Sequence, residues 1–302
     1  MNPMSLPVGD VSAKIARLFV YPVKSCAGVE VQQAVLTETG LEFDRAWMVV
    51  DARGDFVTQR EMPRLALVRP QLKALEIVLR APGMLALHLA LDAVEQPTRV
   101  KVWDDAVPAF DMGGVAAQWF TDFLSLREDG TPAANSAGYR LVRFDPGHRR
   151  VSNLKWTGGV QALNQFSDGY PVLVISEASL ADLNDRLLAG GHHAVGMERF
   201  RPNIVLSGLQ AHDEDRLALM HIDADTASVL LKPVKPCPRC PIPNIDPVTA
   251  VSSPEVGDTL QAYRSDARVA GAITFGMNVI VTAGAGAVLR VGQALAADID
   301  FG

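Results

Sequence analysis

Two cysteines separated by two residues are the strongest candidates for chemistry in this sequence. Cys237 and Cys240 lie in the stretch LKPVKPCPRCPIPNIDPVTA, residues 231–250, which is rich in proline and basic residues. A CxxC pair can be a dithiol redox pair, half of a zinc site, or the source of a thiolate ligand for another cofactor. The residues around the pair distinguish these three uses.

The prolines that follow the pair argue against a thioredoxin-type dithiol. A dithiol of that type needs the first turn of a helix behind it, because the helix dipole lowers the pKa of the thiol. Pro241, Pro243 and Pro247 follow the pair, so no helix is expected to begin there. The dithiol is therefore the less favoured use.

A structural zinc site is disfavoured by the supply of further ligands. Such a site needs four ligands from cysteine and histidine. The remaining candidates do not repeat a metal-ligand spacing; they are Cys26, His88, His148, His192, His193, His212 and His221. The sequence instead predicts a stiff, mostly extended loop that presents one or two sulfurs. The neighbouring cations Lys232, Lys235 and Arg239 favour thiolate over thiol, which suits a ligand of a soft metal.

Length and composition describe a globular protein with about two domains or one large domain. The chain has 302 residues, of which 48% are hydrophobic and 21% charged, and its net charge is −6 at pH 7. This acidic balance argues against non-specific binding of nucleic acid. No apolar run approaches the roughly 20 residues that span a bilayer, and the N-terminus lacks the apolar core of a signal peptide. Three cysteines, an odd and small number, predict a reducing compartment, so we expect a cytoplasmic protein without membrane association.

Short segments rich in valine, phenylalanine and tyrosine predict a mostly β protein with some α-helix. Strands are expected at residues 15–21, 31–36, 46–51, 55–59, 66–69, 76–79, 84–90, 99–103, 139–144, 172–176 and 201–208. Helices are expected at residues 116–124, from the helical spacing of their aromatic residues, and at residues 177–188, with Ser176 as N-cap. The loop-like stretch REDGTPAANSAG, residues 127–138, is the candidate linker between two domains.

Several other polar residues each allow a functional and a structural interpretation. Lys24 and Ser25 lie in a turn, PVKSCAG, that could bind a phosphate or could be an ordinary surface turn. Arg45 and its acidic neighbour fit a structural ion pair as well as a ligand contact. Arg201 and Asn203 begin an expected strand, where capping alone would explain them. The sequence contains no P-loop, GxGxxG, GxSxG or HExxH motif.

Taken together, motifs from about residue 16 to residue 295 resemble those of one family. In chain order they are YPVKSCAG, GLEFDRAWMVV, FVTQR, SDGYPVLVISEASLADLN, ERFRPNIVLSG, KPCPRC with the Asp246 that follows it, FGMN and LRVGQ. They are similar to the motifs of two-part MOSC proteins, which include the mitochondrial amidoxime-reducing component, bacterial N-hydroxy reductases and the C-terminal domain of molybdenum-cofactor sulfurase. The resemblance implies an N-terminal MOSC β-barrel-like domain at residues 12–130 and a MOSC domain, a β-barrel with flanking helices, at residues 131–300. It also implies a molybdenum–molybdopterin cofactor held between them.

The resemblance also assigns site residues. Cys240, the cysteine that directly follows arginine, falls on the family's molybdenum ligand and would be the catalytic residue, while Cys237 is a neighbour that does not bind the metal. The positions that match cofactor-binding residues are Lys24, Ser25, Arg45, Ser176, Glu177, Ala178, Arg201, Asn203, Arg239 and Asn278. An anionic phosphate and an anionic dithiolene–molybdenum centre need lysine and arginine partners, which explains these cations in an otherwise acidic protein.

The function that the resemblance implies is reduction of N-hydroxylated compounds, such as hydroxylamines and amidoximes, to amines. The metal, bound by Cys240, would cycle between Mo(VI) and Mo(IV) with electrons from a separate protein, either a ferredoxin or a cytochrome b5-like protein with its reductase. We expect no fused ferredoxin domain, no pyridoxal phosphate domain and no membrane anchor. The alternative is a carrier of the molybdenum cofactor, or of sulfur as a persulfide on Cys240.

Overall fold

The protein is mostly β, as the sequence predicts. The computed structural model describes residues 9–93, 96–125, 138–224 and 227–300. These residues form nineteen strands and four α-helices. The linker predicted at residues 127–138 lies almost entirely outside them. Among the described residues, no helix has the length and apolar character that a membrane-spanning helix requires.

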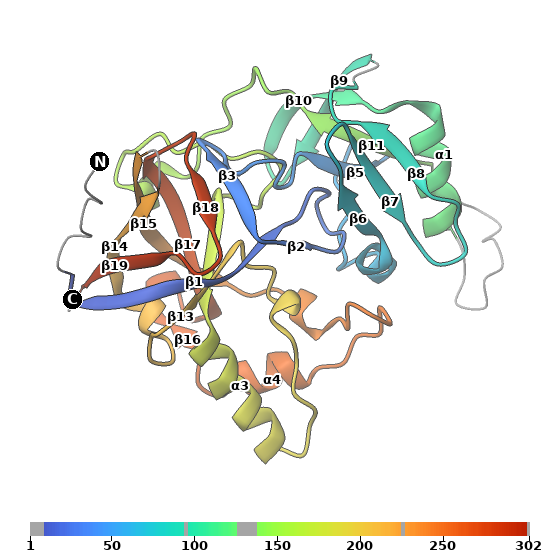
Figure 1. Cartoon of the computed structure of the whole chain (residues 1–302). Helices are drawn as coiled ribbons and strands as arrows, with labels where there is room; N and C mark the ends of the chain where they lie inside the picture. The colour runs from blue at the N-terminus through green and yellow to red at the C-terminus, as the bar shows by residue number, and fades with distance from the viewer. Residues whose placement is uncertain (1–8, 94–95, 126–137, 225–226, 301–302) are drawn as a thin grey trace.

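Seven strands close into a barrel, which forms one of the two β-rich parts seen in Figure 1. Around the barrel the order is β12 (Val172–Ser176), β13 (Ile204–Ser207), β1 (Val11–Val20), β19 (Ala294–Ile299), β14 (Leu217–Ala224), β15 (Ala227–Pro238) and β17 (Ala272–Ala283). Antiparallel pairing of β12 with β17 closes the ring. The neighbours β12 and β13 are parallel, and helix α3 (Glu177–Ala189) connects them. Because β1 comes from the beginning of the chain and the other six strands follow residue 171, both ends of the chain build the barrel.

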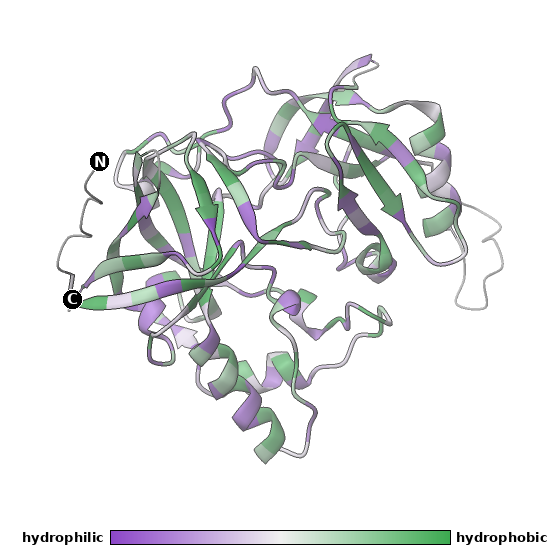
Figure 2. Cartoon of the chain, viewed as in Figure 1, coloured by the Kyte–Doolittle hydropathy of each residue, from purple (hydrophilic) through white to green (hydrophobic). Residues whose placement is uncertain are grey.

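The other part, the N-terminal lobe, contains two sheets and a helix. Its elements are the sheet β5 (Trp47–Asp51), β11 (Tyr139–Phe144), β10 (Asp105–Asp111) and β9 (Gln96–Val102), the sheet β6 (Arg69–Leu72), β7 (Glu76–Arg80) and β8 (Leu87–Ala90), and helix α1 (Gly113–Leu124). Trp47, Phe120 and Phe123 are fully buried between them. Figure 2 shows that the strands of the lobe and of the barrel are coloured mostly as hydrophobic, which fits a separate core in each part.

The remaining elements are short. They are β2 (Val29–Val31), β3 (Gln33–Thr37), β4 (Gly40–Leu41), β16 (Ser265–Asp266), β18 (Val288–Arg290), α2 (Leu154–Thr157), α4 (Glu255–Gln261), and the 3₁₀ helices η1 (Pro63–Leu67), η2 (Met197–Arg199), η3 (Asp213–Arg216), η4 (Ile242–Asn244) and η5 (Ala267–Val269). Strand β2 pairs with β1, and β3 pairs with β18, so the segment that leaves β1 stays attached to the barrel before it enters the lobe.

The expected helices are confirmed as α1 and α3, and the N-cap is confirmed because the Ser176 hydroxyl accepts a hydrogen bond from the backbone N–H of Ser179 at 3.0 Å. Two strand predictions are wrong. Residues 55–59 make only isolated bridges to Val50 and Lys101. Of residues 66–69, the first two end η1 and only Arg69 belongs to a strand, β6. Pro63 begins that 3₁₀ helix, because its fixed φ suits a first helical turn.

The cysteine stretch also differs from the extended loop that the sequence predicts, since its first part continues strand β15 through Pro238. Pairing with β14 ends at Leu231, so beyond that point β15 has only β17 beside it. The register between β15 and β17 shifts at the prolines of this segment. Prolines are tolerated on such a strand edge and at bulges because no ladder N–H is needed there. Cys237 therefore lies on a strand, and Cys240 follows its end.

Gly276, in β17, lies where the barrel closes. Its φ is +79°, and an added Cβ would lie 2.5 Å from Cγ1 of Ile175 and 2.7 Å from the carbonyl oxygen of Val174. We expect Gly276→Ala to lower the free energy of unfolding by about 2–4 kcal/mol, through backbone strain and overpacking together, as measured by urea denaturation. Gly158→Ala is the matched control, because Gly158 also has a positive φ, +65°, but open space around its Cβ position. Its loss should be about 1–2 kcal/mol, and equal losses in the two variants would contradict the steric argument.

Candidate functional site

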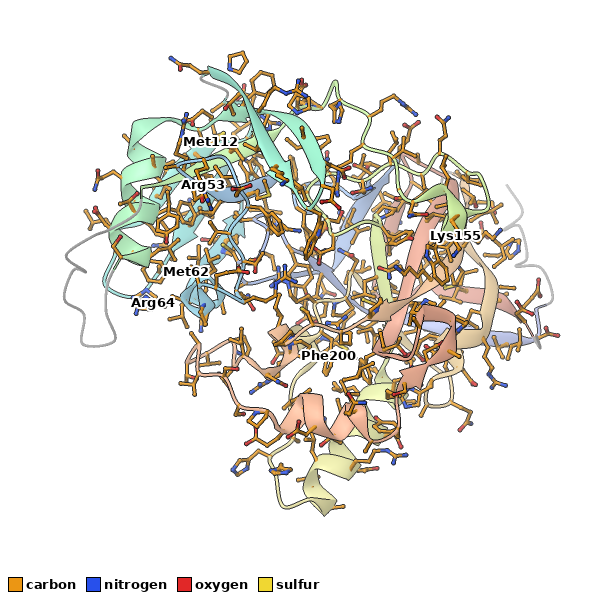
Figure 3. All side chains as sticks on the ribbon, turned by 180° about the vertical axis from the view of Figure 1, so that it is seen from behind. Arg53, Met62, Arg64, Met112, Lys155 and Phe200 are labelled. Atoms are coloured by element: carbon orange, nitrogen blue, oxygen red, sulfur yellow. The ribbon has the colours of Figure 1, made fainter. Side chains whose placement is uncertain are left out.

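One cavity between the N-terminal lobe and the barrel collects polar residues from distant parts of the chain. Its lining includes eight of the eleven predicted site residues, namely Lys24, Ser25, Arg45, Arg201, Asn203, Arg239, Cys240 and Asn278. Figure 3 shows Phe200, which also lines the cavity, near the centre of the molecule, between the lobe that carries Met62 and Arg64 and the barrel. The fold thus brings together turns that the sequence alone leaves ambiguous.

The lining is strongly basic. It contains five cationic side chains, those of Lys24, Arg45, Arg60, Arg201 and Arg239, and one carboxylate among the residues that the model describes. Cations gathered in a partly desolvated cavity repel one another, so an anionic ligand would stabilise them. Guanidinium and ammonium groups are also the usual partners of phosphate oxygens.

Lys24 is held in a buried position at the edge of this cavity. Its Nζ donates to the carbonyl oxygen of Phe166 at 2.7 Å and to Oδ1 of Asp168 at 2.6 Å. The indole N–H of Trp103 donates to the same carboxylate oxygen at 3.3 Å. Burial lowers the pKa of the Lys24 ammonium, and the Asp168 carboxylate opposes that change. The ammonium thus has one of its three donors left for a further acceptor.

Three residues of the lining have left-handed backbones although none is glycine. The φ angles are 66° at Ser25, 51° at Arg45 and 59° at Arg201. Such a conformation costs on the order of 1–3 kcal/mol per residue and persists only where the surroundings enforce it. Here the Arg45 N–H donates to the carbonyl oxygen of Tyr21 at 2.8 Å, and Nη1 of Arg201 donates to the carbonyl oxygen of Cys26 at 2.6 Å. Strain of this kind concentrates at functional sites, so its presence at three lining residues supports this cavity as the site.

Arg45 and Arg201 lie close together with little negative charge between them. Arg45 forms an ion pair with Asp44 at 2.6 Å and donates to the carbonyl oxygen of Arg201 at 3.2 Å. Burial and the charge of Arg45 lower the pKa of Arg201 to about 10, so the Arg201 guanidinium remains charged at neutral pH. Asn203 links this pair to the barrel, because its Oδ1 accepts from Arg45 and from the N–H of Leu173.

Of the two cysteines, Cys237 has a hydrogen-bonded sulfur, whereas the sulfur of Cys240 has no hydrogen bond to any described residue. Nη1 of Arg239 donates to Sγ of Cys237 at 3.2 Å, and Nη2 donates to the carbonyl oxygen of Phe200 at 2.9 Å. Cys240 is half-buried in the cavity wall, and both cysteines are free thiols. Within the described ranges, no three His, Cys, Asp or Glu side chains gather into a metal-binding group.

The donors of the cavity fit a group that brings its own anionic and sulfur ligands. Nε of Arg239 and the hydroxyl of Tyr170 are both buried and have no hydrogen-bond partner among the described residues. Both residues line the cavity. Buried donors without partners are costly, and an acceptor-rich ligand would satisfy them. Together with the five cations and the thiol of Cys240, they match the chemistry of a phosphate-bearing pterin with a bound metal.

The three remaining predicted residues, Ser176, Glu177 and Ala178, do not line the cavity. They form the start of α3, where the Ser176 hydroxyl caps the helix and is fully buried. Glu177 borders a separate hollow beside Arg17. Their role in cofactor binding stays a prediction.

Sequence reasoning missed several residues of the lining. Thr58, Arg60, Asp168 and Tyr170 line the cavity but were not singled out. The signal was present, because they belong to the motifs FVTQR and SDGYP. The sequence does not show that these motifs lie beside Lys24, because Lys24 and Asp168 are 144 positions apart in the chain.

Comparisons with known proteins match both parts of the chain. The model of the MOSC N-terminal beta barrel domain matches residues 12–127, and that of the MOSC domain matches residues 162–296. Rat mitochondrial amidoxime reducing component 2 is 35% identical over 261 residues, which are 83% of this chain and 72% of that protein. Human mitochondrial amidoxime-reducing component 1 is 36% identical over 259 residues, with the same coverage of 83% and 72%. Bovine molybdenum cofactor sulfurase is 28% identical over 277 residues, 86% of this chain but 30% of that protein.

Proposed function

Because the chain belongs to the family that combines a MOSC N-terminal beta barrel domain with a MOSC domain, we propose that it is a molybdenum-cofactor-dependent reductase of N-hydroxylated compounds. Relatives named as amidoxime-reducing components support the reaction type. The observation that carries the proposal is the cavity itself, which is lined by a free thiol, Cys240, and by five cationic side chains.

The cations would hold the anionic parts of the cofactor. We assign Lys24, Ser25, Arg45 and Arg201 to its phosphate and pterin end, because all four line the cavity and Arg45 donates to the carbonyl oxygen of Arg201. Arg239, Asn203 and Asn278 would complete the binding surface from the barrel side. The pKa of Arg201, about 10, keeps its guanidinium charged at neutral pH, so its attraction for an anion does not depend on a proton taken up on binding.

Cys240 would be the single protein ligand of the metal. When bound, the molybdenum cofactor supplies the two electrons that, with two protons, convert an N-hydroxyl group into an amine and water. The protein's part is to fix the sulfur, and the hydrogen bonds of Arg239 to Cys237 and to the carbonyl oxygen of Phe200 hold the chain next to it in place. We further propose that a separate electron-transfer protein, either a ferredoxin or a cytochrome b5-like protein with its reductase, provides the electrons.

A second function remains open because of the similarity to molybdenum cofactor sulfurase. In that case Cys240 would carry sulfur as a persulfide, or the protein would deliver the cofactor to other enzymes. The half-buried position of Cys240 in an open cavity is compatible with both uses.

One assay separates the two functions. The purified protein is loaded with molybdenum cofactor and given benzamidoxime with an artificial electron donor, and formation of benzamidine is measured. Turnover that depends on the cofactor supports the reductase. Absence of turnover, together with transfer of the cofactor or of sulfide to an acceptor apoenzyme, would replace the reductase with the carrier.

A further inference from the structure

We propose that Tyr21 is a positioning residue that holds the two arginines of the cavity, Arg45 and Arg201, against one buried aromatic ring. The Cζ atoms of Arg45 and Arg201 lie 4.4 Å and 4.3 Å from the centroid of the Tyr21 ring. Tyr21 itself does not line the cavity. It therefore acts on a ligand through the two guanidinium groups, and this role rests on the anionic cofactor site proposed above.

The ring cannot easily move away from the arginines. Tyr21 is fully buried, and its backbone N–H donates to Oδ1 of Asp44 at 2.8 Å. Its carbonyl oxygen accepts from the N–H of Arg45 at 2.8 Å. On another side, Gly28 packs so closely that an added Cβ would lie 2.5 Å from Cε1 of the ring. The same residue thus holds the backbone of Arg45 and keeps its ring close to both guanidinium groups.

The ring offers these cations partial negative charge, of which the rest of the site supplies little. Asp44 forms an ion pair with Arg45 at 2.6 Å, whereas Arg201 forms no ion pair with any described residue. The face of an aromatic ring carries partial negative charge, and a cation gains most from it when both are desolvated. A guanidinium that lies flat on a ring also keeps its N–H donors at its edge, free to bind phosphate oxygens. Two like charges can therefore stay close together before any ligand arrives.

The hydroxyl of Tyr21 takes no part in this arrangement. It is buried and has no hydrogen-bond partner among the residues that the model describes. The inference consequently makes a sharp distinction: the ring is required, whereas the hydroxyl is not. If the Tyr21 ring only filled the core, its removal would lower stability without specifically weakening anion binding.

The test measures anion binding by the full-length chain without cofactor, with inorganic pyrophosphate as the probe in isothermal titration calorimetry. Molybdenum per chain, after expression in a molybdenum-replete host, is the second readout. We expect Tyr21→Phe to bind pyrophosphate within about twofold of the unmodified chain, and Tyr21→Leu to bind at least about tenfold more weakly. Phe120→Leu is the matched control, because Phe120 is equally buried but lies in the lobe core away from the cavity. It should lose stability without loss of pyrophosphate affinity.

Gly28→Ala is a second variant that displaces the ring without removing it, and it covers the case in which Tyr21→Leu does not fold. It should also weaken pyrophosphate binding. Unchanged affinity in a folded Tyr21→Leu or Gly28→Ala protein would overturn the positioning role while leaving the cofactor site intact. Equal loss in Phe120→Leu would overturn it as well. If the unmodified chain binds neither pyrophosphate nor molybdenum, the proposed function fails, and the positioning role fails with it.

Discussion

Replacing Cys240 with serine is expected to reduce cofactor-dependent turnover of benzamidoxime by at least about 100-fold. Even residues that only support metal ligands cost 10- to 100-fold when mutated, so loss of the ligand itself should exceed that range. A serine oxygen is a harder ligand than a thiolate and suits a soft-metal centre poorly. Cys240 is half-buried and free, so the fold should survive, with a change in unfolding free energy of about 1 kcal/mol or less. Turnover, molybdenum content and urea denaturation measure the three quantities.

Cys237→Ser is the matched control for this experiment. Sγ of Cys237 accepts a hydrogen bond from Arg239, and a serine oxygen can accept the same bond. Turnover should therefore remain within about threefold of the unmodified protein, an allowance for the shorter side chain. The reverse pattern, with Cys240→Ser active and Cys237→Ser inactive, would assign the metal to the other sulfur. Full activity in both variants would remove the thiolate from the mechanism.

Elements that depend on one local signal could be predicted from the sequence. Helix α3 begins where a serine cap precedes an amphipathic segment, and the prediction ended within one residue of Ala189. Strand β11 was predicted with its observed bounds, Tyr139–Phe144. By contrast, the membership of β1 in the barrel depends on pairing with β13 and β19, which lie more than 180 residues further along the chain. No local pattern contains that information, because strand pairing is a long-range choice.

The prolines of the cysteine stretch show a second limit. They predict an extended chain correctly, but they also suggest that the chain leaves the sheet, since proline cannot donate to a ladder. In the structure, β15 extends beyond the end of its neighbour β14 and continues to pair with β17. Whether a proline lies on a paired or an unpaired strand edge depends on where the adjacent strand ends. That is a property of the whole barrel.

The site residues also divide into those that the sequence indicates and those that only long-range contacts reveal. Lys24, Arg45 and Arg201 were each compatible with an ordinary structural role, and the resemblance to a family connected them before the structure placed them around one cavity. Asp168 was missed because its importance comes from its contact with the Lys24 ammonium, and nothing near it in the sequence indicates a partner. Tyr21 was missed for the same reason, since only the fold shows that two cations share its ring.

Replacing Lys24 with methionine is expected to lower the molybdenum bound per chain by about tenfold or more while preserving the fold. A hydrogen bond to a charged group contributes about 1.5–3 kcal/mol, and each 1.4 kcal/mol corresponds to a factor of ten in affinity. Methionine fills similar space without the cost of burying an ammonium, which is 7% exposed in Lys24. The carboxylate left behind, that of Asp168, is 68% exposed and can be solvated by water. We therefore expect the unfolding free energy to change by no more than about 1 kcal/mol.

The pH dependence gives this prediction a second, independent readout. Burial lowers the pKa of Lys24 below its ordinary value of 10.5, with Asp168 opposing the change. Between the folded-state pKa and 10.5 the unfolded chain binds more protons than the folded chain, so stability due to this residue rises with pH across that window. Affinity for pyrophosphate should fall across the same window, because the ammonium loses its charge. In Lys24→Met, neither this rise in stability nor this fall in pyrophosphate affinity should occur.

Lys235→Met separates the specific role of Lys24 from a general effect of positive charge. Lys235 is also near the site, with its Nζ 5.2 Å from the ring centroid of Trp156, but it does not line the cavity. Its replacement should leave the molybdenum content within about twofold, because a solvent-screened charge outside the cavity contributes little. Equal losses in the two variants would show that the cavity acts only through its summed charge. Retention of molybdenum by Lys24→Met would mean that the Lys24 ammonium serves Asp168 and the fold, and that the phosphate is held by the arginines on the Tyr21 ring.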